Sequence, residues 1–247
     1  LMKIYQLLIE YNGTKFIGWQ KQKKGSSIQS SIEKALKKLT KKKSLIYGSG
    51  RTDSGVHAIE QSAHFKTKFK IKEKIKFINS INFFLNKLDI VILDLKLRKN
   101  NFHARHSAKK RSYKYIIINR QAPLVLEKNR AWNLRKKLDV KIMKKGAKIL
   151  RKLNDFSTFR ASTCGAKNPI KTLEEVKIKK SGNKIEMIFT SQSFLQQQVR
   201  SMVGCLKYLG EGKWNIKKFK SAALSKKRAN CAPPAPANGL FLMKVIY

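Results

Sequence analysis

The sequence predicts an α+β fold in which the sheets are largely antiparallel. Short segments that alternate apolar and polar residues, as strands do, occur between segments whose apolar residues recur at helical spacing. Ser181-Gly182-Asn183 separates two strand-like segments and indicates the turn of a hairpin. Helices and strands mixed along the chain, with hairpins among them, favour an α+β architecture.

The first half of the chain contains four expected strands and two expected helices. Residues 3–11 alternate and are rich in Ile, Leu and Tyr, so they predict a strand. Ser27 fits the N-cap of a helix, because the apolar residues between 28 and 39 then fall on one face. The other expected elements are a short strand at 44–47, a strand at 56–65, a helix near 73–85 and a strand at 90–97.

The second half shows a similar alternation of expected strands and helices. Asp139 is expected to cap a helix that runs to Leu153, and the apolar residues of 196–209 recur at helical spacing. The remaining expected elements are strands at 112–119, 172–179, 184–190 and 240–246, a short helix near 216–224 and a proline-rich loop at 231–236. This similar order of elements suggests two structural repeats joined near residues 102–111, although the residues themselves show no repeat.

The charge of the chain indicates a polyanionic partner. The 247 residues are 42% hydrophobic, enough for one large domain or two compact ones. Lys and Arg number 56 against 14 Asp and Glu, which gives a net charge of +42 and favours nucleic acid as the partner. Lysine greatly outnumbers arginine, however, and a bias toward lysine raises the charge without adding phosphate contacts. Charge alone therefore favours nucleic acid only modestly, and it says nothing about catalysis.

Composition also indicates a cytoplasmic protein without a membrane segment. No stretch approaches the roughly 20 apolar residues that span a bilayer, and the first residues do not resemble a signal peptide. Cys164, Cys205 and Cys231 are odd in number and far apart, so we expect reduced thiols and no disulfide framework. No cysteine has a partner at zinc-ligand spacing, and the histidines do not supply three clustered ligands. We therefore predict no metal and no cofactor.

The segment Gly48-Ser49-Gly50-Arg51-Thr52-Asp53-Ser54-Gly55-Val56-His57-Ala58 is the most informative part of the sequence. Its glycines permit close approach of a bulky ligand. Arg51 and Asp53 are two residues apart, so in extended backbone they point the same way and form either an ion pair or a shared site. The alternative is a turn that contains the aspartate, which is the commoner role of an Asp beside Gly. Spacing alone favours the turn. No helix carrying Lys-Ser or Lys-Thr follows Gly50, so the segment is not a P-loop.

The string Arg51-Thr52-Asp53-Ser54-Gly55-Val56-His57-Ala58 resembles the signature of the tRNA pseudouridine synthase A family. Small departures are Ser54, where the family usually has Ala, the glutamines 196–198 and Ser201. Further similar motifs, in order along nearly the whole chain, are Tyr11-Asn12-Gly13-Thr14 with Phe16 and Gly18-Trp19-Gln20, Phe102-His103-Ala104-Arg105, Tyr113-Lys114-Tyr115, Asp155-Phe156-Ser157, Val199-Arg200, Ala232-Pro233 and Gly239-Leu240-Phe241-Leu242.

The resemblance implies roles for individual residues. Asp53 is the catalytic carboxylate that initiates cleavage of the glycosidic bond. Arg51 binds the substrate backbone or holds the displaced base, and Tyr113 stacks on the target uracil. Arg200 pairs with Asp53 and keeps it ionised, which is physically reasonable because a guanidinium favours the charged carboxylate. Without the resemblance, Arg200 is a helix-surface charge and Tyr113 a half-buried strand aromatic. Arg105, beside His103 and His106, is expected to contact phosphate.

The resemblance also implies a fold, a reaction and partners. The fold is two related α/β sandwich domains, residues 1–105 with the catalytic Asp and residues 106–247, whose antiparallel sheets flank a central basic cleft. The reaction is isomerisation of uridine to pseudouridine at positions 38, 39 and 40 of the tRNA anticodon stem-loop, by a cytoplasmic homodimer without a cofactor. The target base must leave its stack, which suits a stacking tyrosine and basic residues.

Two other classes of function compete with this one. A non-catalytic basic RNA-binding protein explains the charge and the aromatic residues equally well, but it does not predict the context of Asp53 together with Tyr113 and Arg200. A methyltransferase requires a glycine-rich cofactor turn after a strand, and a metal-dependent nuclease requires clustered carboxylates. The sequence offers neither feature.

Overall fold

The computed structural model describes residues 2–247. The chain divides into two compact units, which are described separately below. Unit 1 contains the residues up to Lys109 together with Phe241–Tyr247, and unit 2 contains Lys110–Leu240. Within residues 2–247, no helix is both long and apolar enough to cross a membrane.

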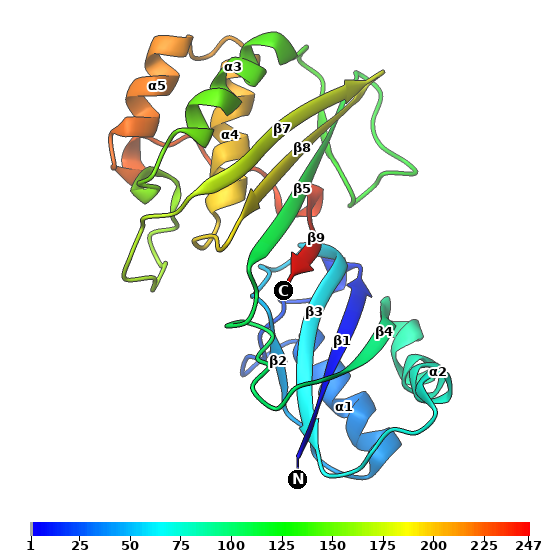
Figure 1. Ribbon diagram of the computed structural model, residues 1–247. Coiled ribbons are helices and arrows are strands. Elements are labelled where there is room, and N and C mark those ends of the chain that lie inside the picture. Colours follow the sequence, from blue (N-terminus) through cyan, green and yellow to red (C-terminus); the bar gives the residue numbers. More distant parts are fainter. Residues whose placement is uncertain (1) are drawn as a thin grey trace. The chain divides into compact units, whose positions relative to one another are not determined.

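Unit 1 is a sheet in the order β4-β1-β3-β9, with the short β2 beside β3. β1 is antiparallel to both β3 and β4, whereas β9 joins β3 in parallel. The strands of this unit are β1 (Lys3–Tyr11), β2 (Ile46–Gly48), β3 (His57–Thr67), β4 (Ile90–Arg98) and β9 (Leu240–Ile246). Its helices are α1 (Ile28–Thr40) and α2 (Lys74–Leu85), which pack on each other, and α2 packs on β4 (Figure 1).

The start of α1 follows from its sequence. The Ser27 hydroxyl accepts a hydrogen bond from the backbone N–H of Ser30, and the Ser30 hydroxyl accepts one from the backbone of Ser27. This reciprocal capping satisfies backbone donors that the first helical turn leaves unpaired. Ile28, Ile32 and Leu36 are fully buried on one face, so the predicted cap and the predicted apolar face of this helix are both confirmed.

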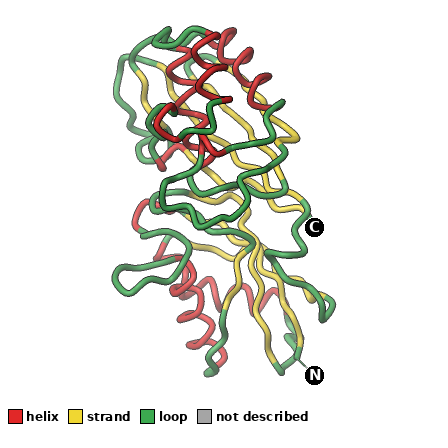
Figure 2. Tube along the Cα trace, turned by 90° about the vertical axis from the view of Figure 1, so that its left-hand side faces the viewer, coloured by secondary structure: helices red, strands yellow, loops and turns green. Residues whose placement is uncertain are grey.

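Unit 2 is a three-stranded antiparallel sheet in the order β5-β8-β7, with β6 added in parallel to β5. Its strands are β5 (Lys110–Asn119), β6 (Trp132–Leu134), β7 (Leu173–Ser181) and β8 (Lys184–Ser191). Its helices are α3 (Val140–Arg151), α4 (Gln198–Gly210) and α5 (Ile216–Leu224). The three helices pack together over one face of the sheet (Figures 1 and 2). Short 3-10 turns lie at Gly13–Lys15, Asn86–Leu88, Ser157–Phe159, Arg228–Asn230 and Ala237–Gly239.

The observed elements confirm the predicted α+β class, with three differences. Parallel pairing of β9 with β3 and of β6 with β5 makes the sheets mixed. β6 was not predicted, because three residues are too few to show a strand period. Asp139 caps α3 through its side chain, as expected, but the helix ends at Arg151, two residues before Leu153.

The chain passes from unit 1 to unit 2 between Lys109 and Lys110. Our division places residues 106–247 together, whereas the contacts join Phe241–Tyr247 to unit 1. The reason is the parallel pairing of β9 with β3, in which His57 and Ala58 lie opposite Phe241 and Leu242. A strand pairing between distant segments leaves no mark in local sequence. Correspondence of the two units to the two family domains stays a prediction.

Candidate active site

The loop between β2 and β3 carries Arg51 and Asp53, and it rests on the segment that leaves β1. Thr52, between these two residues, is buried. Its hydroxyl lies 2.8 Å from the hydroxyl of Tyr11, and its carbonyl accepts a hydrogen bond from the backbone N–H of Trp19 at 3.0 Å. Because Thr52 is held on two sides, the positions of Arg51 and Asp53 are fixed by the packing of the loop. Arg51 is exposed and Asp53 is half-buried.

Two glycines allow these segments to approach each other closely. Gly18 has a φ of 112°, and a Cβ atom there would lie 2.6 Å from the carbonyl oxygen of Thr52. A Cβ atom at Gly13 would lie 2.0 Å from the carbonyl oxygen of Val56. Both distances are shorter than any allowed contact, so only glycine fits. The motif in the exit of β1 is therefore the support on which the Asp53 loop is built.

The loop turns sharply directly after Asp53. The backbone N–H of Val56 donates to the carbonyl of Asp53 at 3.2 Å, and Gly55 has a φ of 77°. This is a four-residue turn that needs glycine at its third position. The Ser54 hydroxyl donates to the carbonyl of Phe16 at 3.0 Å. The turn and the shared site, which the sequence offered as alternatives, are thus compatible, because the turn uses the backbone carbonyl of Asp53.

Arg51 and Arg105 are both exposed side chains of unit 1. The Nε of Arg51 donates to Oε1 of Gln20 at 3.1 Å. Sequence reasoning did not single out Gln20, although it belongs to the Gly18-Trp19-Gln20 motif. Arg105 lies in the segment between β4 and β5, where its backbone N–H donates to Nδ1 of His103 at 3.1 Å. Its predicted contact with phosphate stays a prediction.

The histidines beside Arg105 form a cluster of rings. The ring centroids of His64 and His103 are 4.7 Å apart, and those of His103 and His106 are 4.4 Å apart. Burial, helped by neighbouring positive charge, lowers the pKa of His64 from 6.5 to about 4, and burial also lowers the pKa of His103. Both rings are therefore mainly neutral near pH 7. Among residues 2–247, no group of three or more His, Cys, Asp and Glu side chains could hold a metal ion.

Tyr113 lies on β5 in unit 2, and only 8% of its surface is exposed. Its ring packs edge-on against Phe194, with centroids 5.2 Å apart and an interplanar angle of 88°. The ring is therefore more buried than a half-buried strand aromatic. Sequence reasoning assigned no role to Phe194, and the structure identifies it as the neighbour of Tyr113. Stacking of Tyr113 on uracil stays a prediction.

Arg200, in the first turn of α4, holds a distant loop and is not a helix-surface charge. Its Nε donates to the carbonyl of Ala235 at 2.7 Å, and the backbone N–H of Ala235 donates to the carbonyl of Arg200 at 2.9 Å. The hydroxyl of Tyr115 donates to the next carbonyl, that of Pro236, at 2.8 Å. Burial raises the pKa of Tyr115, against the opposing effect of the Arg200 charge. Tyr115 is therefore a neutral donor near pH 7.

Two of the departures from the family pattern, the glutamines 196–198 and Ser201, lie in the same region. Gln198 is fully buried, and its Oε1 accepts from the backbone N–H of Leu195 at 2.8 Å. Within the described residues, the Nε2 of Gln198 and the hydroxyl of Ser201 are buried without a hydrogen-bond partner. Gln197 precedes the helix in a left-handed conformation, with a φ of 58°. The glutamine run therefore shapes the start of α4, where Arg200 lies.

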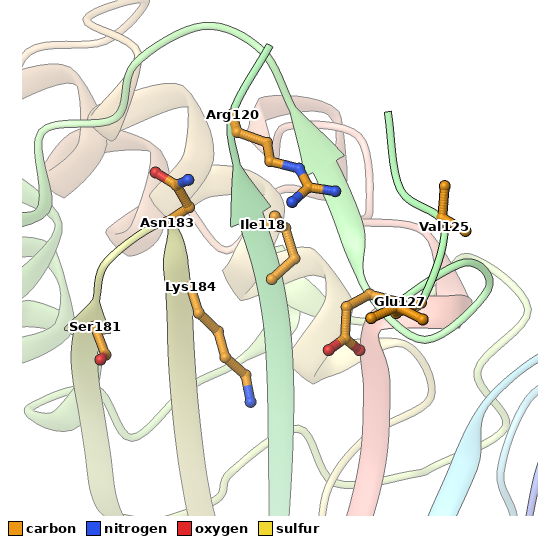
Figure 3. A pocket seen from close by; sticks show the side chains of 8 residues that line it. Ile118, Arg120, Val125, Glu127, Ser181, Asn183 and Lys184 are labelled. Atoms are coloured by element: carbon orange, nitrogen blue, oxygen red, sulfur yellow. The ribbon is translucent and has the colours of Figure 1, made fainter. Parts of the chain in front are cut away.

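A cavity of about 350 Å³ in unit 2 lies apart from these side chains. It is formed at the end of β5, by the loop that follows it and by the β7-β8 turn (Figure 3). Ile118, Arg120, Glu127 and Lys184 are among its lining residues, and none of the predicted site residues is. The structure thus places Arg51, Asp53 and Arg105 in unit 1, and Tyr113 and Arg200 in unit 2. Pairing of Asp53 with Arg200 stays a prediction.

Comparison with known proteins agrees with these motifs. The profile of the tRNA pseudouridine synthase family matches residues 7–82 and 153–247, which include Asp53 and Arg200. The chain is 60% identical over 243 residues to the tRNA pseudouridine synthase A of Pelagibacter ubique, covering 98% of this chain and 99% of that protein. It is 43% identical over 246 residues to the protein of the same name from Methylocella silvestris, covering 100% and 99% of the two chains. It is 40% identical over 247 residues to that of Maricaulis maris, covering 100% and 98%. The chain therefore belongs to the tRNA pseudouridine synthase family.

Proposed function

We propose that this protein isomerises uridine to pseudouridine at positions 38, 39 and 40 of the tRNA anticodon stem-loop, with Asp53 as the catalytic carboxylate. The observation that carries the proposal is the Arg51-Thr52-Asp53 loop, which Thr52 and two close-packed glycines fix against the exit of β1. A fixed carboxylate suits catalysis because the reacting groups must be held in a near-attack geometry. Relatives that match over nearly their whole length and are named tRNA pseudouridine synthase A support the substrate.

The reaction is an isomerisation that needs no external energy source. The bond between N1 of uracil and C1′ of the ribose breaks, the base turns, and a bond forms between C5 and C1′. The hydrogen on C5 leaves to solvent, and N1 gains a proton. A carboxylate can begin this sequence by attack on C1′, by attack on C6 or by removal of the C2′ proton. Each of the three routes gives Asp53 the first step. The target nucleotide must leave its stack before the enzyme can reach these atoms.

The other candidate residues have supporting roles in the proposal. Arg51, held by Gln20, binds the substrate backbone or the displaced base, and Arg105 contacts phosphate. Arg200 pairs with Asp53 and keeps it ionised. Its Nε donates to Ala235, which fixes the plane of the guanidinium, and a fixed plane favours bidentate pairing with a carboxylate. Tyr113 stacks on the uracil ring.

The partners expected from the resemblance belong to the same proposal. The protein acts on tRNA in the cytoplasm as a homodimer, and its two units correspond to the two family domains. The net charge of +42 supports phosphate-dominated binding. We expect tRNA affinity to fall steeply as salt rises, because each neutralised phosphate releases a counterion. Sedimentation should give twice the mass of one chain. Salt-insensitive binding would argue against the first expectation, and a single-chain mass against the second.

Tritium release from tRNA labelled at C5 of uridine tests the catalytic assignment. The Asp53→Asn variant removes the charge and keeps the shape, so we expect release to fall by roughly 1000-fold or more. Asp89→Asn is the matched control, since Asp89 is an exposed acid of the same unit that pairs with Lys15 at 3.3 Å. Its release should equal that of the parent protein.

The same assay separates the competing functions. Tight tRNA binding without release by the parent protein would favour a non-catalytic RNA-binding protein. Release by both the parent and Asp53→Asn would support the enzymatic function but reject Asp53 as the catalytic residue. Mapping of the modified positions then tests 38, 39 and 40, and pseudouridine formed only elsewhere in the tRNA would overturn the positional assignment.

A further inference from the structure

The segment 231–236 is pressed against one face of α4. A Cβ atom at Gly204 would lie 2.0 Å from the carbonyl oxygen of Pro233, so only glycine permits this approach. The backbone N–H of Ala232 donates to Sγ of Cys205 at 3.4 Å. Further along, Arg200 and Ala235 exchange the hydrogen bonds described above. The segment therefore contacts α4 at several successive positions, from Ala232 to Ala235.

This packing brings two thiols together. Sγ of Cys205, on α4, lies 3.4 Å from Sγ of Cys231, at the start of the segment. A disulfide bond is about 2.0 Å long, so the sulfur atoms need to approach by about 1.4 Å. Cys205 is 2% exposed, whereas Cys231 is half-buried and within reach of a small oxidant. The sequence predicted three reduced thiols far apart in the chain, and the fold makes two of them neighbours.

The surroundings give the two sulfur atoms different reactivity. The hydrogen bond from Cys205, followed by the charge of Arg228, lowers the pKa of the Cys231 thiol. The same hydrogen bond and burial raise the pKa of the Cys205 thiol. Because the thiolate is the nucleophile in thiol chemistry, Cys231 reacts first with an oxidant, and Cys205 is the second thiol.

We propose that Cys205 and Cys231 are a reversible dithiol site that closes to an intramolecular disulfide when the protein meets a peroxide or a small disulfide. With hydrogen peroxide, the Cys231 thiolate attacks one oxygen, which gives a sulfenic acid and hydroxide. The sulfur of Cys205 then attacks the Cys231 sulfur, and water leaves. Two thiols are oxidised and one peroxide is reduced to two waters. With a small disulfide, a mixed disulfide forms at Cys231 and the attack of Cys205 releases the second small thiol.

The disulfide would tie α4 to the segment that receives the Arg200 hydrogen bond. The residues between the two cysteines include α5, so the closed loop joins three parts of unit 2. A crosslink of this kind restricts the unfolded chain. We therefore expect the thermal midpoint of the oxidised protein to lie several degrees above that of the reduced protein, and the difference to vanish in Cys205→Ser.

The experiment is a mass measurement on the whole protein and needs no enzymatic readout. The reduced chain has three free thiols, at Cys164, Cys205 and Cys231. After brief exposure to hydrogen peroxide or diamide, alkylation should label one thiol in place of three, and a non-reducing peptide map should show Cys205 joined to Cys231. Dithiothreitol should restore all three. Cys164→Ser is the matched control and should still close the bond, whereas Cys205→Ser and Cys231→Ser should not.

Three results would overturn the proposal. One is equal reactivity of all three thiols, and another is oxidation of Cys231 to a sulfinic acid without a crosslink. The third is a disulfide between two chains. These outcomes are read on the parent protein, so they do not depend on the folding of any variant. They are also independent of whether Asp53 is catalytic.

Discussion

Two regions of this protein carry the candidate chemistry, and they are built in different ways. In unit 1, the Asp53 loop is held by the segment that leaves β1, with Thr52 bound to Tyr11 and Trp19 and with Gly13 and Gly18 at the points of contact. In unit 2, Arg200 is held by a carbonyl 35 residues further along the chain. The first region depends on backbone fit, and the second depends on a charged side chain.

This difference determines which substitutions should affect chemistry and which should affect folding. A residue that acts through its charge can be replaced with little change in packing. A glycine that permits contact between two segments cannot be replaced without moving one of them. Both regions contain such a glycine, so the comparison can be tested with matched variants, beginning with the substitution of largest expected effect.

If Arg200 pairs with Asp53 as proposed, Arg200→Ala should lower the rate of tritium release by roughly 100-fold to 1000-fold, because the carboxylate then loses the charge that orients it. Arg200→Lys keeps the charge but not the planar group, and we expect a smaller loss. The measurement is kcat and KM for labelled tRNA. Arg151→Ala, on the exposed face of α3, is the control. If turnover in Arg200→Ala is undiminished, Arg200 and the region around it have only a structural role.

Gly13→Ala and Gly204→Ala place the same methyl group in two contacts of equal closeness. In each case the new Cβ would lie 2.0 Å from a backbone carbonyl oxygen, that of Val56 or that of Pro233. We expect each substitution to lower the free energy of unfolding by about 2 to 3 kcal/mol, as overpacking commonly does. Gly165→Ala is the control, since nothing lies within 4 Å of its added methyl group.

The two glycine variants should lose similar amounts of stability but different amounts of activity. Gly13→Ala moves the loop that carries Asp53, so its loss of tritium release should exceed that of Gly204→Ala after correction for the folded fraction. Chemical denaturation gives the stability, and the corrected rate gives the activity. Equal activity losses would contradict the view that the Gly13 contact matters more for the chemistry than the Gly204 contact.

Local signals in the sequence predicted much of this structure. The Ser27 and Asp139 caps, the apolar face of α1 and the Ser181-Gly182-Asn183 hairpin all use interactions between residues a few positions apart. The motif around Asp53 was found through the resemblance, which its contiguous residues carry. Arg51 to Val56 form the loop and His57 and Ala58 begin β3, and Gly55, which the turn needs, is visible in the printed sequence.

Interactions between distant segments were not predictable in this way. The parallel pairing of β9 with β3, the contact of Cys205 with Cys231 and the support of Arg200 by Ala235 each join segments far apart in the chain. Three-residue β6 was missed because it shows no period. Arg200 was assigned through the resemblance. Nothing in its spacing distinguishes a half-buried side chain that holds a loop from a charge on the helix surface.

Tyr115→Phe tests the anchoring of the 235–236 carbonyls without touching Arg200. It removes the hydrogen bond that the Tyr115 hydroxyl donates to the carbonyl of Pro236. We expect a loss of about 1.5 kcal/mol in the free energy of unfolding and a several-fold loss of activity. Tyr47→Phe, at an exposed tyrosine of unit 1, is the control. No change in either quantity would show that the segment does not need the Tyr115 hydrogen bond.

The smallest expected effect concerns pH, and it follows from the placement of all four histidines in unit 1. The pKa of His64 is about 4 in the folded protein and 6.5 when unperturbed, so the unfolded chain binds the proton more readily. Stability is therefore complete above pH 6.5 and falls as the pH drops from 6.5 toward 4. Because His64 is fully buried, solvent screens little of this effect, and we expect a loss of about 1 kcal/mol at pH 5.5. Hydrogen exchange at pH 5.5 should show the loss in peptides of unit 1 and not in those of unit 2, where the carboxylates with lowered pKa, Asp155 and Glu186, have ordinary values of 3.8 and 4.5 and still contribute their stability. His64→Gln should remove the pH dependence in unit 1. Persistence of the effect in that variant would assign it to His103 or to another group of the unit.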